Sequence, residues 1–304
     1  MSEHTERPVL VVVNPTAGLG SVGDGARARA ELAASLAVAH GSAVEVVVTT
    51  QAGHARELAS SAARRGARMV VAWGGDGTVN EVASSLAGSN TVLAVVPAGS
   101  GNGLARELNV PLDPRLAFDA AMAGIDRRID LGSLDGRIFV NVAGVGLDAR
   151  VAQRFAEIGR DRRGMARYVR AAVREVLLFR PDDLMIEVGG GRHDVRPLLI
   201  AFANGRQYGN GAMVAPGARI DDGLLHVVVV TSRSTWGIMR GVPALFGGRL
   251  DMQPGVTTHA VVEALVTSTG PVLCHVDGEP HVGGLRVEVR ILPKALTVRV
   301  PAGA

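Results

Sequence analysis

Lysine is nearly absent from this sequence: Lys294 is the only one, and the other basic side chains are arginines. A Walker-type nucleotide loop requires a lysine directly after its last glycine, and a pyridoxal enzyme requires a lysine for its Schiff base. Lys294 is badly placed for either role, because it lies close to the end of the sequence. Any phosphate site in this chain therefore has to use arginine side chains, backbone N–H groups or a bound metal.

Cysteine and long apolar runs are equally scarce. Cys274 is the only cysteine, which excludes an internal disulfide and a cysteine-based zinc site. No uninterrupted apolar run approaches the roughly 18 residues of a membrane span, and Met1 to Pro8 lacks the apolar core of a signal peptide. We therefore expect a cytoplasmic protein without a transmembrane segment.

The composition is that of a globular protein with few aromatic residues. Hydrophobic residues make up 47% of the chain, charged residues 20%, and Trp, Tyr and Phe together only 3%. The core must therefore consist mainly of Val, Leu and Ala. A length of 304 residues favours two domains. The formal net charge is only +3, and we expect no nucleic-acid partner.

The first part of the chain alternates strand and helix patterns, which predicts an α/β domain with a parallel sheet and right-handed crossovers. The expected strands are Val9–Val13, Val44–Val48, Met69–Trp73 and Val92–Val96, and the expected helices are about 25–39, 53–65, 78–86 and one starting at 104. Ligands of such sheets lie beyond the carboxyl ends of the strands.

After about Ile125 short strand patterns joined by turns predict an antiparallel β domain, a sandwich in our interpretation. The expected strands are near 127–134, 138–145, 183–188, 195–203, 224–231, 257–267, 272–276, 285–291 and 296–300. We place the domains at 1–124 and 125–292, and about 293–304 could return to the first.

Two helical segments interrupt this second domain. In the first, about 150–179, one helix face carries Arg163, Arg167, Arg170 and Arg174. That face is either an ordinary solvated surface or a contact with an anionic membrane. The second segment, about 236–250, either lines an apolar pocket or belongs to the core.

Three glycine-rich loops follow strands of the first domain: 14–20, 74–78 and 97–103. Where such a loop opens a helix, free N–H groups and the helix dipole attract an anion, and the absence of Cβ atoms allows a phosphate to approach closely. Asp76 is out of place beside a bare phosphate, so it suggests a magnesium-bound nucleotide.

Each of these motifs also has a purely structural interpretation. A single Gly-Gly-Asp-Gly-Thr can be a turn, and Asp-Gly in 277–278 and 222–223 is a strong hairpin signal. Three loops at one sheet edge favour the nucleotide interpretation. The histidines show no metal-ligand spacing, so we expect each to be structural or exposed.

The motifs occur in a distinctive order: NPTAG, GGDGTVNEV, PAGSGNGLAREL, NGRQYGNGAMVAPGARIDDGLL and HVDGEP. In this order the chain resembles the bacterial members of the diacylglycerol kinase and sphingosine kinase catalytic-domain family, which are related to NAD kinases. The resemblance covers nearly the whole chain. It implies an NAD kinase/phosphofructokinase-like α/β domain, a β-sandwich domain, ATP bound between them, and phosphoryl transfer to a lipid hydroxyl.

The resemblance also implies roles for individual residues. The catalytic residues would be Asp76, acting through magnesium, with Asp277 and the candidate general base Glu279. Those that bind ATP would be Asn14, Gly18, Gly74, Gly75, Asp76, Gly77, Thr78, Ser100, Gly101 and Asn102. A structural Mg²⁺ would be held by the Asp222 carboxylate and by backbone carbonyls of Ala218 and Leu224.

Two departures leave the acceptor lipid open. Gly103 stands where diacylglycerol kinases commonly carry Asp, which is more like the sphingosine and ceramide kinase branch. Lysine-based charge networks of some relatives must here be replaced by arginine, such as Arg106, or be absent. We expect a lipid substrate reached peripherally at the inner membrane surface, in phospholipid metabolism. Homodimerisation stays open. The alternatives are phosphorylation of a soluble dinucleotide such as NAD, and a nucleotide-binding module without turnover.

Overall fold

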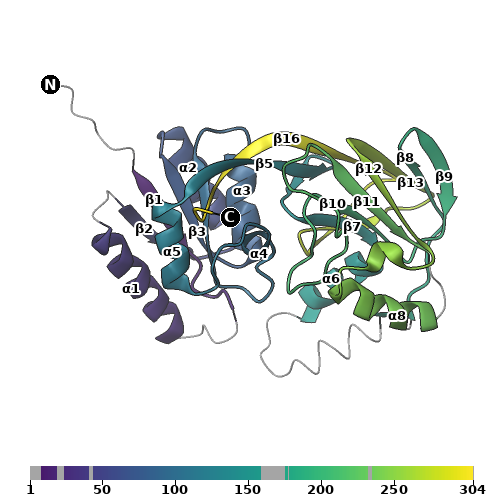
Figure 1. The fold of residues 1–304 in the computed structure, drawn as a ribbon, viewed down its shortest axis with the longest axis horizontal. Coiled ribbons are helices and arrows are strands. Elements are labelled where there is room, and N and C mark those ends of the chain that lie inside the picture. Colours follow the sequence, from purple (N-terminus) through teal and green to yellow (C-terminus); the bar gives the residue numbers. More distant parts are fainter. Residues whose placement is uncertain are drawn as a thin grey trace. The chain divides into compact units, whose positions relative to one another are not determined.

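The computed structural model describes residues 8–18, 24–40, 44–158, 175–176, 178–231 and 235–303. The chain divides into two compact units: Met1–Ile129 with Lys294–Ala304, and Asp130–Pro293. Figure 1 shows the elements of both. Two strands, β5 (Ile125–Leu134) and β16 (Arg286–Val300), carry the chain across the boundary.

The first unit is an α/β domain built on a parallel sheet. Its further elements are β1 (Val9–Val13), α1 (Asp24–Ala39), β2 (Val44–Val48), α2 (His54–Arg64), β3 (Met69–Gly74), α3 (Asp76–Leu86), β4 (Val92–Pro97), α4 (Gly103–Glu107) and α5 (Pro114–Ala123). The strand order is β2-β1-β3-β4, and the end of β16 adds in parallel to β4. Every residue of β1, β3 and β4 is buried, which explains their continuous apolar runs.

Helix α5 was not among the elements expected from the sequence, although its start is well marked. Asp113 accepts hydrogen bonds from the backbone N–H groups of Arg115 and Leu116, and Pro114 occupies the first helical position. Phe118 is fully buried, with its ring centroid 6.0 Å from that of Trp73. The few aromatic residues therefore help to attach this helix to the sheet.

The second unit consists largely of antiparallel strands. Its further elements are β6 (Arg137–Phe139), β7 (Val142–Gly146), α6 (Leu147–Ile158), β8 (Leu184–Val188), β9 (Gly191–Val195), β10 (Leu199–Ala203), β11 (Leu225–Val230), α8 (Thr235–Phe246), the 3-10 helix η1 (Leu250–Met252), β12 (Val256–Val261), β13 (Glu263–Ser268), β14 (Leu273–Val276) and β15 (Glu279–Val282).

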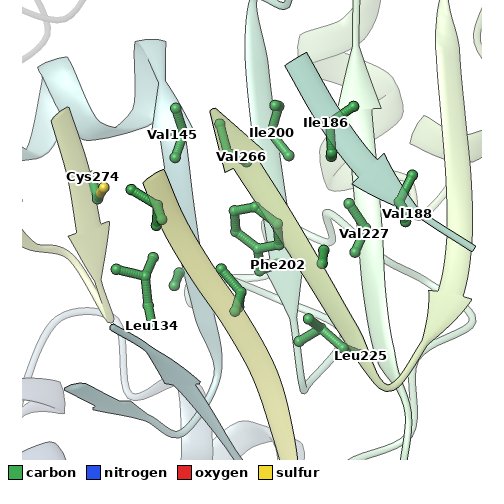
Figure 2. Packing of buried hydrophobic residues seen from close by; sticks show 14 of the residues in the cluster. Leu134, Val145, Ile186, Val188, Ile200, Phe202, Leu225, Val227, Val266 and Cys274 are labelled. Atoms are coloured by element: carbon green, nitrogen blue, oxygen red, sulfur yellow. The ribbon is translucent and has the colours of Figure 1, made fainter. Parts of the chain in front are cut away.

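Two sheets of this unit pack face to face. One has the order β12-β11-β10-β7-β14-β15, and in the other β16, β13, β8 and β9 are neighbours. Figure 2 shows Phe202 and Ile200 of the first sheet beside Val266 and Ile186 of the second, and all four belong to one buried cluster. The expected fold class, an α/β domain followed by an antiparallel β-sandwich, is confirmed.

The strand boundaries differ from expectation where the chain changes sheets. The single strand expected at 257–267 is two strands, β12 and β13, which lie in different sheets and meet at the exposed Val262. The strands expected at 285–291 and 296–300 form one long strand, β16, with the backbone of Lys294 at φ 53°. The hairpin strands β9 and β15 were not expected.

The two helical segments of the second unit are described in part. Helix α6 ends at Ile158, and Arg163, Arg167, Arg170 and Arg174 lie outside the described residues. In α8, Leu245 packs against a second buried cluster, whereas Val242 and Phe246 are more than half exposed. Within the described residues, none of the helices has the length and apolarity needed to cross a membrane.

Candidate active site

The three glycine-rich loops lie together at the carboxyl edge of the parallel sheet. Val13 pairs with Trp73, and Gly74 pairs with Pro97, so β1, β3 and β4 end side by side. The loops are joined directly by backbone hydrogen bonds. Asn14 N donates to Trp73 O, and Ala98 N donates to Gly74 O, each at 2.8 Å.

Polar side chains connect the first loop to both neighbouring helices. Asn14 Nδ2 donates to the hydroxyl of the buried Thr78 at 2.8 Å, which joins the loop to α3. On the other side, the Arg29 guanidinium of α1 donates to Asn14 O at 2.8 Å and to Ala17 O at 2.9 Å. Partial burial lowers the pKa of Arg29 from its ordinary value. The sequence offered no signal for this role of Arg29.

The glycines of the loops are needed for contact between the loops themselves. A Cβ atom on Gly99 would lie 2.7 Å from Gly75 Cα, and one on Gly74 would lie 2.5 Å from Thr78 Oγ1. Gly18, at φ 82°, would clash with Ala98 O. Glycine is therefore required here by packing, in addition to any closeness of a phosphate.

Asp76 is the first residue of α3, where the helix dipole favours a carboxylate. Asn102 N donates to Asp76 Oδ2 at 2.9 Å, and Gly103 N donates to Asp76 Oδ1 at 2.6 Å. A Cβ on Gly101 would lie 2.6 Å from Asp76 Oδ2. These backbone donors explain why a carboxylate can lie in the loop without a cation. The presence of Asp76 in the loop is therefore not by itself evidence for magnesium.

The third loop is held by its own polar side chains. Asn102, at φ 51°, accepts from Gly99 N at 2.9 Å and donates to Gly99 O at 2.8 Å. Arg106 Nε donates to Gly101 O at 3.0 Å. Ser100 is exposed in this loop, and Gly77 lies half-buried in the first turn of α3.

Glu81, the last polar residue of the GGDGTVNEV motif, has a structural role that sequence reasoning missed. Its carboxylate accepts from Gly53 N at 2.9 Å and from Arg56 N at 3.3 Å. It therefore caps the start of α2, whose own N-cap residue, Gly53, has no side chain for this purpose.

In the second unit, Asp277 and Glu279 lie on the tight turn between β14 and β15. Val276 pairs with Glu279, and the two central residues have φ values of 47° and 86°, as in the primed hairpin turns. The Asp277 carboxylate accepts from the backbone N–H groups of Val140, Asn141 and Val142 at 2.7, 2.9 and 3.1 Å. Asp277 thus anchors the start of β7, whereas Glu279 is exposed.

Beside this turn lies a group of polar side chains that the sequence did not reveal, of which His275 is buried and Asp148 and Tyr208 are partly buried. Asp148 Oδ2 accepts from Tyr208 Oη at 2.9 Å and lies 3.1 Å from His275 Nε2. Burial, followed by the charge of Asp148, raises the pKa of Tyr208 well above its ordinary value. Asp148 follows a buried strand and a glycine at the start of a helix, the same pattern that marked the first-unit loops.

The residues expected to hold a structural magnesium lie in one loop. Asp222 Oδ1 accepts from Leu224 N at 3.0 Å, and Asp222 Oδ2 lies 3.7 Å from His226 Nε2. Ala218 is buried, and its backbone N donates to Ala215 O. One carboxylate with carbonyl oxygens is donor chemistry that suits Mg²⁺. Across the described ranges, no group of three or more His, Cys, Asp or Glu is arranged to hold a metal ion.

Comparison with known proteins supports both units. Residues 8–134 match the model of the diacylglycerol kinase catalytic domain, and residues 141–300 match that of the YegS C-terminal NAD kinase beta sandwich-like domain. A Mycobacterium tuberculosis protein named "Diacylglycerol kinase" is 31% identical over 99% of this chain and 97% of its own length. A Klebsiella pneumoniae "Probable lipid kinase YegS-like" is 30% identical over 85% of this chain and 86% of its own.

A solved structure shares the fold across its whole length. The crystal structure of a protein described as a diacylglycerol kinase from Bacillus anthracis aligns with a TM-score of 0.73 at 18% identity, over 97% of each chain.

Proposed function

The chain belongs to the diacylglycerol kinase catalytic-domain family and is a lipid kinase, and we propose that it transfers the γ-phosphoryl group of ATP to the hydroxyl of a diacylglycerol or of a sphingoid or ceramide-like lipid. The observation that carries the proposal is the meeting of three glycine-rich loops around the start of α3, with Asp76 bound to the third loop. Such an edge suits a polyphosphate.

We assign the nucleotide to the residues that form this edge. They are Asn14 and Gly18 of the first loop, Gly74, Gly75, Asp76, Gly77 and Thr78 of the second, and Ser100, Gly101 and Asn102 of the third. Bound magnesium would neutralise charge on the phosphates. Together with positioning of the reactants, such charge stabilisation accounts for most of the catalysis of phosphoryl transfer. Arg29 and Arg106 hold the backbone of the loops, and they stand in for the missing lysines in this positioning role.

Glu279 is our candidate for the general base. It removes the proton of the lipid hydroxyl while the hydroxyl oxygen bonds to the γ-phosphorus and ADP leaves. Its exposed carboxylate, on a tight turn, suits this role. The Asp277 carboxylate, by contrast, accepts hydrogen bonds from three backbone N–H groups, so we assign it to holding the turn. Asp222, with the carbonyls of Ala218 and Leu224, remains the candidate structural magnesium site.

We place the enzyme at the cytoplasmic surface of the membrane, where its lipid substrates reside. Val242 and Phe246 support this placement, because they lie one turn apart on α8 with exposed fractions of 52% and 56%. Exposed apolar side chains on a helix can enter the lipid interface.

The test is a panel assay. The protein is incubated with labelled ATP, magnesium and vesicles that contain diacylglycerol, sphingosine, ceramide, monoacylglycerol or phosphatidylglycerol, and with Glu279→Gln protein as the matched control. We expect a labelled organic-phase product from at least one lipid. Absence of product from all five would overturn the proposal, and phosphorylation of NAD without vesicles would favour the dinucleotide alternative.

A further inference from the structure

Three polar side chains from separate elements of the second unit meet beside the turn that carries Glu279: the buried His275 and the partly buried Asp148 and Tyr208. Asp148 is the second residue of α6, Tyr208 follows β10, and His275 belongs to β14. Their side chains are joined through Asp148 Oδ2, at 2.9 Å from Tyr208 Oη and 3.1 Å from His275 Nε2. The other ring nitrogen, His275 Nδ1, accepts from Gly278 N at 3.2 Å. A continuous path of hydrogen bonds therefore runs from Tyr208 to the turn.

The neighbours of His275 select one tautomer of its ring. Gly278 N can only donate, so Nδ1 must be the acceptor, and the hydrogen of the neutral ring then resides on Nε2, which faces Asp148. The two sides of the imidazole are thus matched to different partners. Asp148 orients the ring, and the ring holds the turn.

The surrounding strands leave space for this arrangement. Gly144 lies directly opposite His275 in the β7–β14 pair. A Cβ on Gly144 would clash with Asp148 Oδ2 and lie 2.7 Å from His275 Nε2. Withdrawing polar groups such as His275 from water is costly unless each has a partner, and apolar packing of equal volume is often at least as stable. General stability is therefore a weak reason for these residues to be here.

We propose that Tyr208, Asp148 and His275 are positioning residues that hold the 276–279 turn and thereby aim the Glu279 carboxylate for phosphoryl transfer. Gly278 is fixed by His275 on one side, and Asp277 is fixed by three N–H groups at the start of β7. A displacement of about 1 Å in a reacting group can cost about a hundredfold in rate. This inference rests on the proposed function.

A matched pair of substitutions at His275 separates its two roles. In His275→Asn, the amide oxygen takes the place of Nδ1 and can still accept from Gly278 N, whereas the bond to Asp148 is lost. In His275→Gln, the amide nitrogen takes the place of Nε2 and can still donate to Asp148, whereas the bond to Gly278 is lost. Cys274→Ala, at the neighbouring buried position in the same strand, serves as a control for lost stability alone.

We expect His275→Gln to lower kcat by about tenfold or more with KM for ATP unchanged, and His275→Asn to keep kcat within about threefold of wild type. Amide exchange at Gly278, followed by NMR, should accelerate in the Gln variant only. Cys274→Ala should lower the melting temperature without lowering kcat. Equal kcat in both His275 variants, or losses of kcat that follow melting temperature across all three, would overturn the inference.

The same experiment distinguishes failure of this inference from failure of the proposed function. If wild-type protein phosphorylates no lipid, the proposed function fails, and with it the catalytic consequence drawn here. Exchange at Gly278 in the two His275 variants still decides whether the imidazole holds the turn: equal exchange in both would show that it does not.

Discussion

The two regions that carry the candidate catalytic carboxylates hold them by different means. In the first unit, Asp76 accepts two N–H groups from a neighbouring loop. In the second, Asp277 accepts three from the start of a strand, whereas Glu279, two residues later, is exposed. An aspartate in a glycine turn is thus first an acceptor for backbone donors. Motif membership alone therefore does not tell how far a carboxylate is exposed or which backbone groups it accepts from.

The regions also differ in what makes them rigid. The first-unit edge depends on the absence of side chains, since Gly75 and Gly99 bring two backbones into direct contact. The second-unit turn depends on the presence of side chains, since Asp277 and His275 hold it through hydrogen bonds. A glycine-to-alanine substitution should therefore disturb the loops of the first unit, and loss of a hydrogen-bond acceptor should disturb the turn of the second.

The largest expected effect comes from substitution of the exposed Glu279. Glu279→Gln removes the proposed base while keeping its shape, so kcat should fall by about two orders of magnitude or more. Because Glu279 is exposed, the melting temperature should stay close to that of wild type. Steady-state kinetics with the accepted lipid and a thermal melt measure both quantities. Wild-type kcat would remove Glu279 from the mechanism.

Asp76→Ala should lower turnover by a similar factor, about two orders of magnitude, but for a mixed reason. The substitution removes the carboxylate and also leaves the N–H groups of Asn102 and Gly103 without their acceptor. We therefore expect a loss of stability that Glu279→Gln does not show. Kinetics and urea denaturation on the two variants make the comparison, and wild-type turnover would contradict the assignment.

The fold was largely predictable from the sequence because its signals are local. Buried parallel strands read as apolar runs, and Val9–Val13, Met69–Trp73 and Val92–Val96 match the structure to within a residue. The change of sheet at Val262 was not predictable, because the hydrophobic pattern of a strand is the same in either sheet of a sandwich. The hairpin strand β15 is short, mostly exposed and begins with Glu-Pro, so its pattern carries little apolar signal.

The candidate site was predictable in its loops and less so in its contacts. Strand order and loop composition brought Asn14, Asp76 and Asn102 to one edge. The partners of Asp76, and the link between Asp148 and His275, join residues 26 and 127 positions apart. Contacts of that range depend on tertiary packing, which local pattern and propensity do not encode.

Asp277→Asn tests whether Asp277 has a structural role, in contrast with the catalytic role proposed for Glu279. The new amide offers one acceptor oxygen in place of two, and its NH₂ group would face a backbone N–H donor. We expect the free energy of unfolding to fall by about 1–3 kcal/mol, the cost of leaving a buried donor unpaired. Urea denaturation measures it. An unchanged stability with a large loss of kcat would instead mean that Asp277 acts in the chemistry.

Gly101→Ala tests whether a Cβ atom disturbs the packing of the glycine-rich loops in the first unit. Its Cβ would lie 2.6 Å from Asp76 Oδ2, so the third loop must shift away from α3. We expect KM for ATP to rise by about tenfold, equivalent to about 1.4 kcal/mol, with a smaller change in kcat. Gly270→Ala is the control, because nothing lies within 4 Å of the Cβ it would gain. Equal KM values in the two variants would contradict the packing role of Gly101.

Proton binding provides the smallest contrast between the regions. Burial raises the pKa of Cys274 to about 12, whereas an unfolded thiol titrates near about 8.5. The native state therefore keeps its proton while the unfolded state loses it, so stability falls as pH rises above about 8.5, by about 0.8 kcal/mol at pH about 9. Urea denaturation at two pH values should show this fall in wild type and a flatter one in Cys274→Ala. Hydrogen exchange should rise with pH in β14 beyond the intrinsic rate and not in β3, and equal pH slopes in the two proteins would show that Cys274 does not titrate on unfolding.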